Sequence, residues 1–208
     1  MEIVQYGNPE SPVVLLQPVD ERSLAMIEKE IAAITKAADD DYQLLACKVE
    51  SWNRDLSPWK SPAVFGKDGF GNGAKATLDE ILKLCFDRKK TYYIGGYSLA
   101  GLFALWAACQ TDAFKGVAAA SPSVWFPGFT EYLRDHPMQT GAVFLSLGDR
   151  EDKTRNPVMA SVGAKIRQTH DILQAQNIPC ILEWNPGSHF KDADIRTAKA
   201  FSWIMNKT

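Results

Sequence analysis

The chain has 208 residues, of which 46% are hydrophobic and 23% are charged, and its formal net charge at pH 7 is −2. These values are typical of one soluble globular domain with a sizeable core, and we expect that domain to span residues 1–208. The nearly balanced charge favours neither nucleic acid nor an anionic membrane as a partner. No apolar run approaches the roughly 20 residues of a membrane span.

The cysteines and the first residues bear on the compartment. Cys47, Cys85, Cys109 and Cys180 are scattered through apolar stretches and are not closely spaced. Such a pattern is typical of small buried thiols, and it resembles neither a disulfide framework nor a metal site. The first residues carry neither the basic segment nor the apolar run of a secretory leader. We therefore expect a cytoplasmic protein.

Short apolar runs alternate with helical patterns in the first half of the chain. Strands are predicted at residues 3–6, 13–17 and 44–49. Apolar residues at helical spacing predict a helix over 24–34, capped by Asp20 or Ser23. After a long irregular segment, 51–73, a second helix is predicted over 78–90, with basic residues in its last turn. Aromatic residues in the irregular segment argue against disorder.

The same alternation continues to the C-terminus. Strands are predicted at residues 92–97, 116–120, 142–148 and 178–184. Helices are expected directly after Ser98, over 158–173 and at the end of the chain. The last of these helices should bury Ile195, Ala198, Phe201 and Ile204. The pattern predicts an α/β protein with one mostly parallel sheet of about six to eight strands and helices on both faces. The short chain leaves room for a small cap or none.

Ser98 lies where a strand-like run meets a wholly apolar helix. Gly96 and Ala100, two residues before and two after it, are small, which lets a strand and a helix pass closely at a sharp turn. This arrangement predicts a nucleophile elbow with the Ser98 hydroxyl at its apex. Ala100 departs from the strict G-x-S-x-G pattern, although Gly101 follows it directly. The alternative is an ordinary turn in which Ser98 only caps the helix.

Four polar strand ends are expected to meet at the carboxyl edge of the sheet. They are Gln17-Pro18-Val19, Gly96-Tyr97-Ser98, Asp149-Arg150-Glu151-Asp152 and Gly187-Ser188-His189. Together they supply backbone donors, a hydroxyl, carboxylates and an imidazole, which are the parts of a hydroxyl nucleophile, its base and an orienting acid. His136 precedes every candidate acid and His170 lies inside a helix, so His189 is predicted as the general base; the alternative is a helix-start residue without a catalytic role.

The acid and the oxyanion donors are less sharply marked. The spacing from Gly148 favours Glu151 as the acid, with Asp152 as the second choice. The amide of Leu99, at the start of the helix after Ser98, is predicted to stabilise an oxyanion. A second amide is expected from Val19, because Pro18 has no N–H to donate.

Aromatic residues near the strand ends are candidates for the wall of a substrate pocket. They are Trp52, Trp59, Tyr97 and Trp125. Simple packing of the loops is the alternative explanation for the tryptophans among them. No spacing of histidine, cysteine or carboxylate residues matches a metal site, and we expect neither a metal nor a cofactor.

The assembled motifs resemble those of the α/β-hydrolase superfamily. Within it, the chain is similar to the group of esterases that includes esterase D and the enterobactin-type trilactone esterases. The resemblance covers nearly the whole length and rests on residues 96–101, 121–126, 148–151 and 187–190. It implies Ser98 as nucleophile, His189 as general base and Glu151 as acid. It also implies hydrolysis of a small carboxylic ester through an acyl-enzyme.

Two other functions use the same residues differently. The Gln17-Pro18 sequence stands where the family commonly has a His-Gly element, and this departure favours a catalytically silent binding protein with the same fold. An acyltransferase or a thioesterase would use the same serine, histidine and acid.

Overall fold

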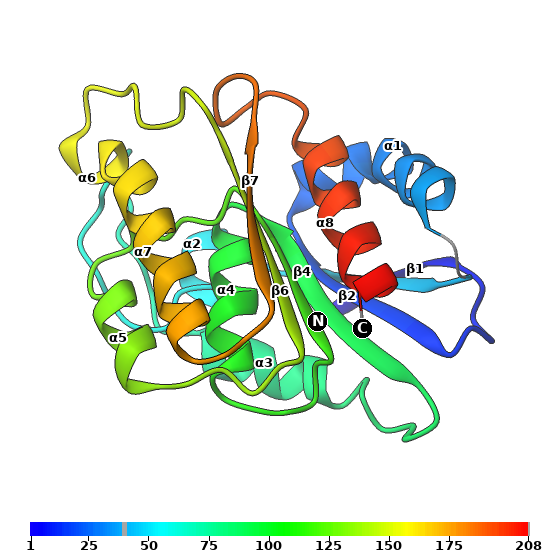
Figure 1. Ribbon diagram of the computed structural model, residues 1–208. Coiled ribbons are helices and arrows are strands. Elements are labelled where there is room, and N and C mark those ends of the chain that lie inside the picture. The colour runs from blue at the N-terminus through cyan, green and yellow to red at the C-terminus, as the bar shows by residue number, and fades with distance from the viewer. Residues whose placement is uncertain (39–40, 208) are drawn as a thin grey trace.

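The computed structural model describes residues 1–38 and 41–207, which form one seven-stranded sheet (Figure 1). Its strands are β1 (Glu2–Gly7), β2 (Val13–Val19), β3 (Gln43–Lys48), β4 (Thr91–Tyr97), β5 (Gly116–Ala120), β6 (Ala142–Gly148) and β7 (Cys180–Asn185). The spatial order is β1-β3-β2-β4-β5-β6-β7. Only the edge pair of β1 and β3 is antiparallel among these strands. The predicted single, mostly parallel sheet is confirmed.

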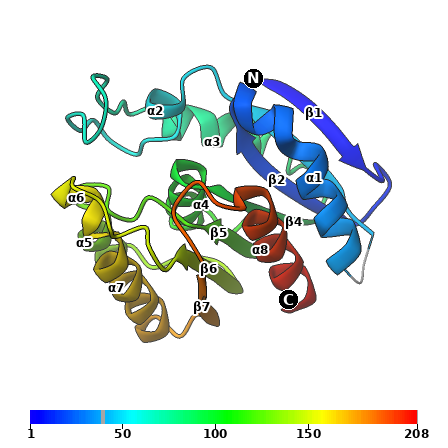
Figure 2. The same cartoon turned by 90° about the horizontal axis from the view of Figure 1, so that it is seen from above.

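Helices cover both faces of this sheet. They are α1 (Glu21–Ala37), α2 (Trp52–Asp55), α3 (Ala74–Leu82), α4 (Leu99–Ala108), α5 (Phe129–Asp135), α6 (Pro157–Ala160), α7 (Val162–Ala175) and α8 (Ala193–Lys207). Seen from above, α1 and α8 lie together on one face, and the other helices lie on the opposite side (Figure 2). No helix in the described part of the chain is both long and apolar enough to cross a membrane.

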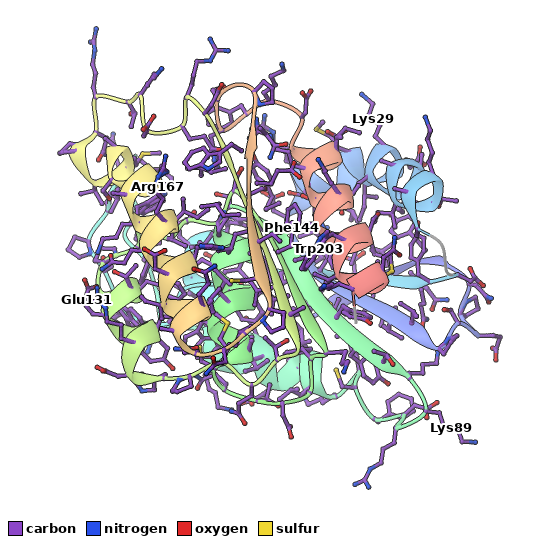
Figure 3. The ribbon with its side chains drawn as sticks, viewed as in Figure 1. Lys29, Lys89, Glu131, Phe144, Arg167 and Trp203 are labelled. Carbon is purple, nitrogen blue, oxygen red and sulfur yellow. The ribbon has the colours of Figure 1, made fainter. Side chains whose placement is uncertain are left out.

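Each face of the sheet contributes to its own hydrophobic core. Along β2, Leu15 points into the core under α1 and α8, whereas Leu16 points into the core under α3 and α4. A strand buried on both faces needs a continuous apolar sequence, which is why β2 could be recognised as a parallel strand. On the first face, Phe144 of β6 packs against Trp203 of α8 with ring centroids 5.8 Å apart (Figure 3).

The helices of the first half begin as predicted, but one ends early. Asp20 is the cap of α1, since its carboxylate accepts a 2.7 Å hydrogen bond from the amide of Ser23. The predicted helix over 78–90 is wrong beyond Leu82, where α3 ends. The carboxylate of Asp87 accepts a hydrogen bond from the amide of Lys89, which folds the segment into a turn leading to β4.

The second half differs from the prediction in three helices. The predicted helix over 158–173 is interrupted at Ser161, which separates α6 from α7. The sequence pattern did not indicate α5. This helix begins directly after Gly128, whose backbone has a left-handed conformation with φ of 81°. In α8, Ile195 is 50% exposed and not buried as predicted. Steps of three residues drift by about 60° around a helix, so Ile195 lies off the stripe formed by Phe201 and its neighbours.

The irregular segment 51–73 is ordered by short contacts with the rest of the chain. It contains α2 and a bridge between Ser61 and Phe70. Gly71 lies so close to α2 that a side chain at this position would begin 2.7 Å from the backbone of Arg54. Phe70 also packs against Phe126 with ring centroids 5.2 Å apart. The segment is therefore attached to the fold through its aromatic side chains.

Candidate active site

Ser98 occupies a strained turn between β4 and α4. Its backbone has φ of 58° and ψ of −118°, a conformation that costs of the order of 1–3 kcal/mol for a residue with a side chain. Its amide donates to the carbonyl of Ala120 at 3.1 Å, and its carbonyl accepts from the amide of Ser123 at 3.0 Å. The Ser98 side chain makes no capping hydrogen bond with the described amides of α4. The alternative that Ser98 only caps the helix is therefore wrong.

The small residues around Ser98 are needed because the strand and the helix nearly touch. Gly96 has φ of 154°, and a side chain added there would begin 2.7 Å from the Cβ atom of Ala100. With glycine on the strand side, the helix side has room for the methyl group of alanine. This explains how the turn tolerates Ala100 in place of the usual glycine.

Three side chains from separate loops form one chain of hydrogen bonds. The Nε2 atom of His189 lies 3.0 Å from the Oγ atom of Ser98, and its Nδ1 atom lies 2.6 Å from the Oε2 atom of Glu151. Asp152, the second choice for the acid, is exposed, and its carboxylate lies beside Gly163. A hydroxyl bonded to an imidazole, which is bonded in turn to a carboxylate, can pass its proton to the imidazole as the oxygen attacks.

Glu151 is held by donors on its second oxygen as well. Its side chain is 3% exposed, and Oε1 accepts from the amide of Gly148 at 2.7 Å and from the hydroxyl of Ser121 at 2.8 Å. Burial by itself would raise the pKa of Glu151, but the hydrogen bond and charge of His189, together with the bonds from Gly148 and Ser121, outweigh it and lower the pKa. The carboxylate is therefore ionised at neutral pH and can stabilise an imidazolium.

Arg196 of α8 is a buried member of the site that sequence reasoning missed. Its Nη1 atom donates to Oε1 of Glu151 at 3.0 Å and to the hydroxyl of Tyr97 at 3.1 Å. Its Nη2 atom donates to the carbonyls of Pro186 and Ser188, which belong to the loop that carries His189. One guanidinium thus connects the acid, the elbow strand and the histidine loop. The sequence contained one signal for this role, a charged residue next to the apolar positions of the predicted last helix.

Tyr97 supports the loop that carries His189. Its hydroxyl donates a 2.8 Å hydrogen bond to the carbonyl of His189. Burial, followed by the charge of Glu151, raises the pKa of Tyr97 to about 12, so the hydroxyl keeps the proton that it donates. The side chain predicted to contact substrate therefore also positions His189.

A cavity of about 440 Å³ opens beside Ser98 and His189. Its lining residues come from the carboxyl end of β2, from α1 and from the start of α8. Its walls include Gln17, Pro18, Glu30, Trp52, Tyr97 and Thr197. Of residues 51–73, all of which the structure describes, Trp52 alone lines the cavity. The hydroxyl of Ser98 therefore faces a space large enough for a small organic molecule.

The predicted oxyanion donors occupy two different settings. Leu99 is the first residue of α4, where backbone amides and the helix dipole favour a negative charge. Val19 is fully buried, and its carbonyl accepts a 3.0 Å hydrogen bond from the amide of Val49. Val19 is absent from the described lining of the cavity, whereas its neighbours Pro18 and Asp20 are part of it. Its amide as second donor stays a prediction.

Trp59 and Trp125 lie outside the described lining of the cavity. The indole nitrogen of Trp59 donates to the carbonyl of Pro127 at 3.0 Å, and its ring packs against Phe126. Trp125 contacts Phe70, with ring centroids 6.0 Å apart. Both tryptophans attach the 51–73 segment to the fold. Packing of the loops, and not contact with the cavity, therefore accounts for their positions.

The sheet order, the strained serine turn after β4 and the histidine loop after β7 define the α/β-hydrolase fold. The fold expected from the resemblance is therefore confirmed. No protein-family model matches the sequence, and no curated protein matches it significantly.

Known structures with this fold include several esterases. The siderophore hydrolase EstB from Aspergillus nidulans superposes with a TM-score of 0.69 at 16% identity, covering 96% of this chain and 84% of that one. A Bacillus cereus carboxylesterase gives 0.63 at 18% identity, covering 100% and 95%. Zea mays acyl-protein thioesterase 2 gives 0.61 at 14% identity, covering 98% and 99%. At these identities the likeness shows the fold.

Proposed function

We propose that the protein is a serine hydrolase that cleaves a small carboxylic ester. The observation that carries this proposal is the hydrogen-bonded chain from Ser98 through His189 to Glu151, which opens onto a cavity. Nucleophile, base and orienting acid are the three groups that acyl transfer through a serine requires. The names of the structural neighbours, a siderophore hydrolase and a carboxylesterase among them, support the same reaction class.

The reaction proceeds in two halves through an acyl-enzyme. The oxygen of Ser98 attacks the ester carbonyl while Nε2 of His189 takes the hydroxyl proton, and the carboxylate of Glu151 stabilises the imidazolium. The amides of Leu99 and Val19 donate hydrogen bonds to the oxyanion, each worth a few kcal/mol in the transition state. The imidazolium then protonates the leaving alcohol. In the second half, His189 takes a proton from water as the water oxygen attacks the acyl carbonyl, and the imidazolium then returns the proton to the oxygen of Ser98 as the carboxylic acid leaves.

Turnover of p-nitrophenyl esters with short acyl chains tests this proposal. The Ser98→Ala variant should lose at least about 10³-fold in kcat, because the groups of such a triad act as a unit. Ser161→Ala is a matched control, since this serine lies between α6 and α7 and is not part of the described cavity lining; its turnover should equal that of the unmodified protein. Equal turnover by folded Ser98→Ala protein would refute the proposal and favour the catalytically silent alternative.

The same assay measures the choice of acyl donor. The thioesterase among the structural neighbours makes thioesters the natural competing substrates. We expect kcat/KM for an oxygen ester to exceed that for the thioester of the same acyl group. A preference for the thioester, or transfer of the acyl group to an added alcohol in place of water, would change the reaction class while keeping Ser98 as nucleophile.

We also propose that the protein works in the reducing cytoplasm. Cys47, Cys85, Cys109 and Cys180 are all free. Burial raises the pKa of the first three thiols to about 12, which keeps them unreactive. Alkylation of the unfolded protein without reductant should modify four thiols, and fewer would point to an oxidising compartment.

A further inference from the structure

The cavity is lined by a buried carboxyl and a buried amide that each have one oxygen without a hydrogen-bond partner in the described part of the chain. The side chains of Gln17 and Glu30 are deeply buried, with residue exposures of 4% and 6%, and both line the same cavity as Ser98. The amide nitrogen of Gln17 donates to Oε2 of Glu30 at 3.3 Å. Within the described part of the chain, Oε1 of Gln17 and Oε1 of Glu30 have no hydrogen-bond partner. Two buried oxygens without donors are costly unless a ligand supplies the donors.

The charged residues that line this cavity favour a cationic ligand. Asp20, Asp192 and Asp194 line the cavity in addition to Glu30, against two cationic side chains, Arg22 and Lys29. Lys29 is exposed and extends outward from α1 (Figure 3). No ion pair to Glu30 occurs among residues 1–38 and 41–207. The buried carboxyl therefore lacks a protein counter-ion.

The surroundings of Glu30 favour its protonated form. Burial, aided by the charge of Asp194 on α8 and opposed by the hydrogen bond from Gln17 on β2, raises the pKa of Glu30 to about 8. Burial, and after it the charge of Glu30, raises the pKa of Tyr42, just before β3, so the Tyr42 hydroxyl interacts electrostatically with this carboxyl. A cation placed beside Glu30 would favour its ionised form, so binding of the cation should release the proton.

We propose that Gln17 and Glu30 form a subsite for a primary ammonium group of the ester substrate. The inference rests on the proposed esterase function, because the subsite shares one cavity with Ser98 and His189. An ammonium group carries three N–H donors, which can satisfy both unpartnered oxygens. Its charge also neutralises the carboxylate that forms at Glu30. A neutral hydroxyl group has one donor and would leave the acidic lining uncompensated.

Binding of n-hexylammonium, measured by titration calorimetry at pH 7, tests the subsite without any turnover. The affinity should exceed that for n-hexanol at least 10-fold. Comparison of two buffers with different ionisation enthalpies should show release of most of one proton, because a group with a pKa of about 8 is mostly protonated at pH 7. In Glu30→Gln the affinity for hexylammonium should fall at least 10-fold and the proton release should vanish. Equal affinity for hexanol, or unchanged binding by the variant, would overturn the subsite.

Turnover separates the failure of this inference from failure of the proposed function. The p-nitrophenyl esters of 6-aminohexanoate and 6-hydroxyhexanoate differ in the charged group alone. The ratio of their kcat/KM values should favour the ammonium ester at least 10-fold, and Glu30→Gln should abolish that preference. Glu28→Gln, at an exposed position of the same helix, should keep it. A ratio near one with active enzyme would overturn only the subsite, whereas hexylammonium binding without turnover of any ester would overturn only the hydrolase function.

Discussion

The buried carboxyl of Glu30 should make the stability of the protein fall as the pH rises. Its pKa is about 8 in the folded protein, against 4.5 as the ordinary value that we assign to the unfolded chain. Between these two pH values the folded state binds more protons than the unfolded state, so the free energy of unfolding decreases with pH. Each pKa unit corresponds to about 1.4 kcal/mol, which makes the total loss roughly 5 kcal/mol by pH 9. Below pH 4.5 both states hold the proton, so this group no longer makes the free energy of unfolding depend on pH.

Replacement of Glu30 by glutamine should remove this dependence, because glutamine keeps the shape of the protonated carboxyl but does not titrate. Urea unfolding at pH 5, 7 and 9 measures it. As the pH rises from 5 to 9, the free energy of unfolding of Glu30→Gln should increase by several kcal/mol relative to that of the unmodified protein. Glu28→Gln, on the exposed side of α1, should show no such gain. Parallel stability curves for Glu30→Gln and the unmodified protein would refute the buried, unpaired state of this carboxyl.

Three further substitutions test the supporting contacts of the site. Arg196→Leu removes a buried partner of Glu151 and should lower the free energy of unfolding by about 3–5 kcal/mol in urea, together with kcat; unchanged values would show that the guanidinium positions nothing. Because the pKa of Glu151 is lowered in the folded protein, its stabilisation is present above pH 4.5 and is lost as the pH falls through the lowered value. Glu151→Gln should therefore show a shallower loss of stability in acid, and an identical acid limb would contradict the assignment. Gly96→Ala should cost about 2 kcal/mol or more in thermal unfolding, since its new methyl group would meet Ala100; a neutral effect would mean that the turn relaxes easily.

Much of the fold follows from local patterns in the sequence. The buried parallel strands are short continuous apolar runs, and alternation with helical patterns determines that they form one sheet between two helical layers. The early end of α3 and the break at Ser161 were not predicted, because side-chain hydrogen bonds and turn geometry, and not periodicity, decide them. The predicted helix over 78–90 was therefore too long, and the predicted helix over 158–173 lacked the break at Ser161.

The candidate site was predictable where a residue sits in a distinctive local motif. Ser98, Glu151 and His189 each follow a strand, and parallel strands bring their carboxyl ends to one edge of the sheet. Arg196 and Glu30 lie inside helices; Arg196 reaches Glu151, and Glu30 reaches the cavity, only because α8 and α1 pack on the same face of the sheet. Contacts of this kind depend on the tertiary arrangement, which one sequence does not reveal.

The covalent intermediate on Ser98 is the most direct test of the account. The protein should be quenched in acid within milliseconds of mixing with excess p-nitrophenyl butyrate, digested, and analysed by mass spectrometry. One butyryl group should be found on the peptide that contains Ser98, with none on the same peptide from Ser98→Ala protein. Turnover of the ester with no acyl group on Ser98, or with the group on another residue, would contradict the assignment of Ser98 as the nucleophile.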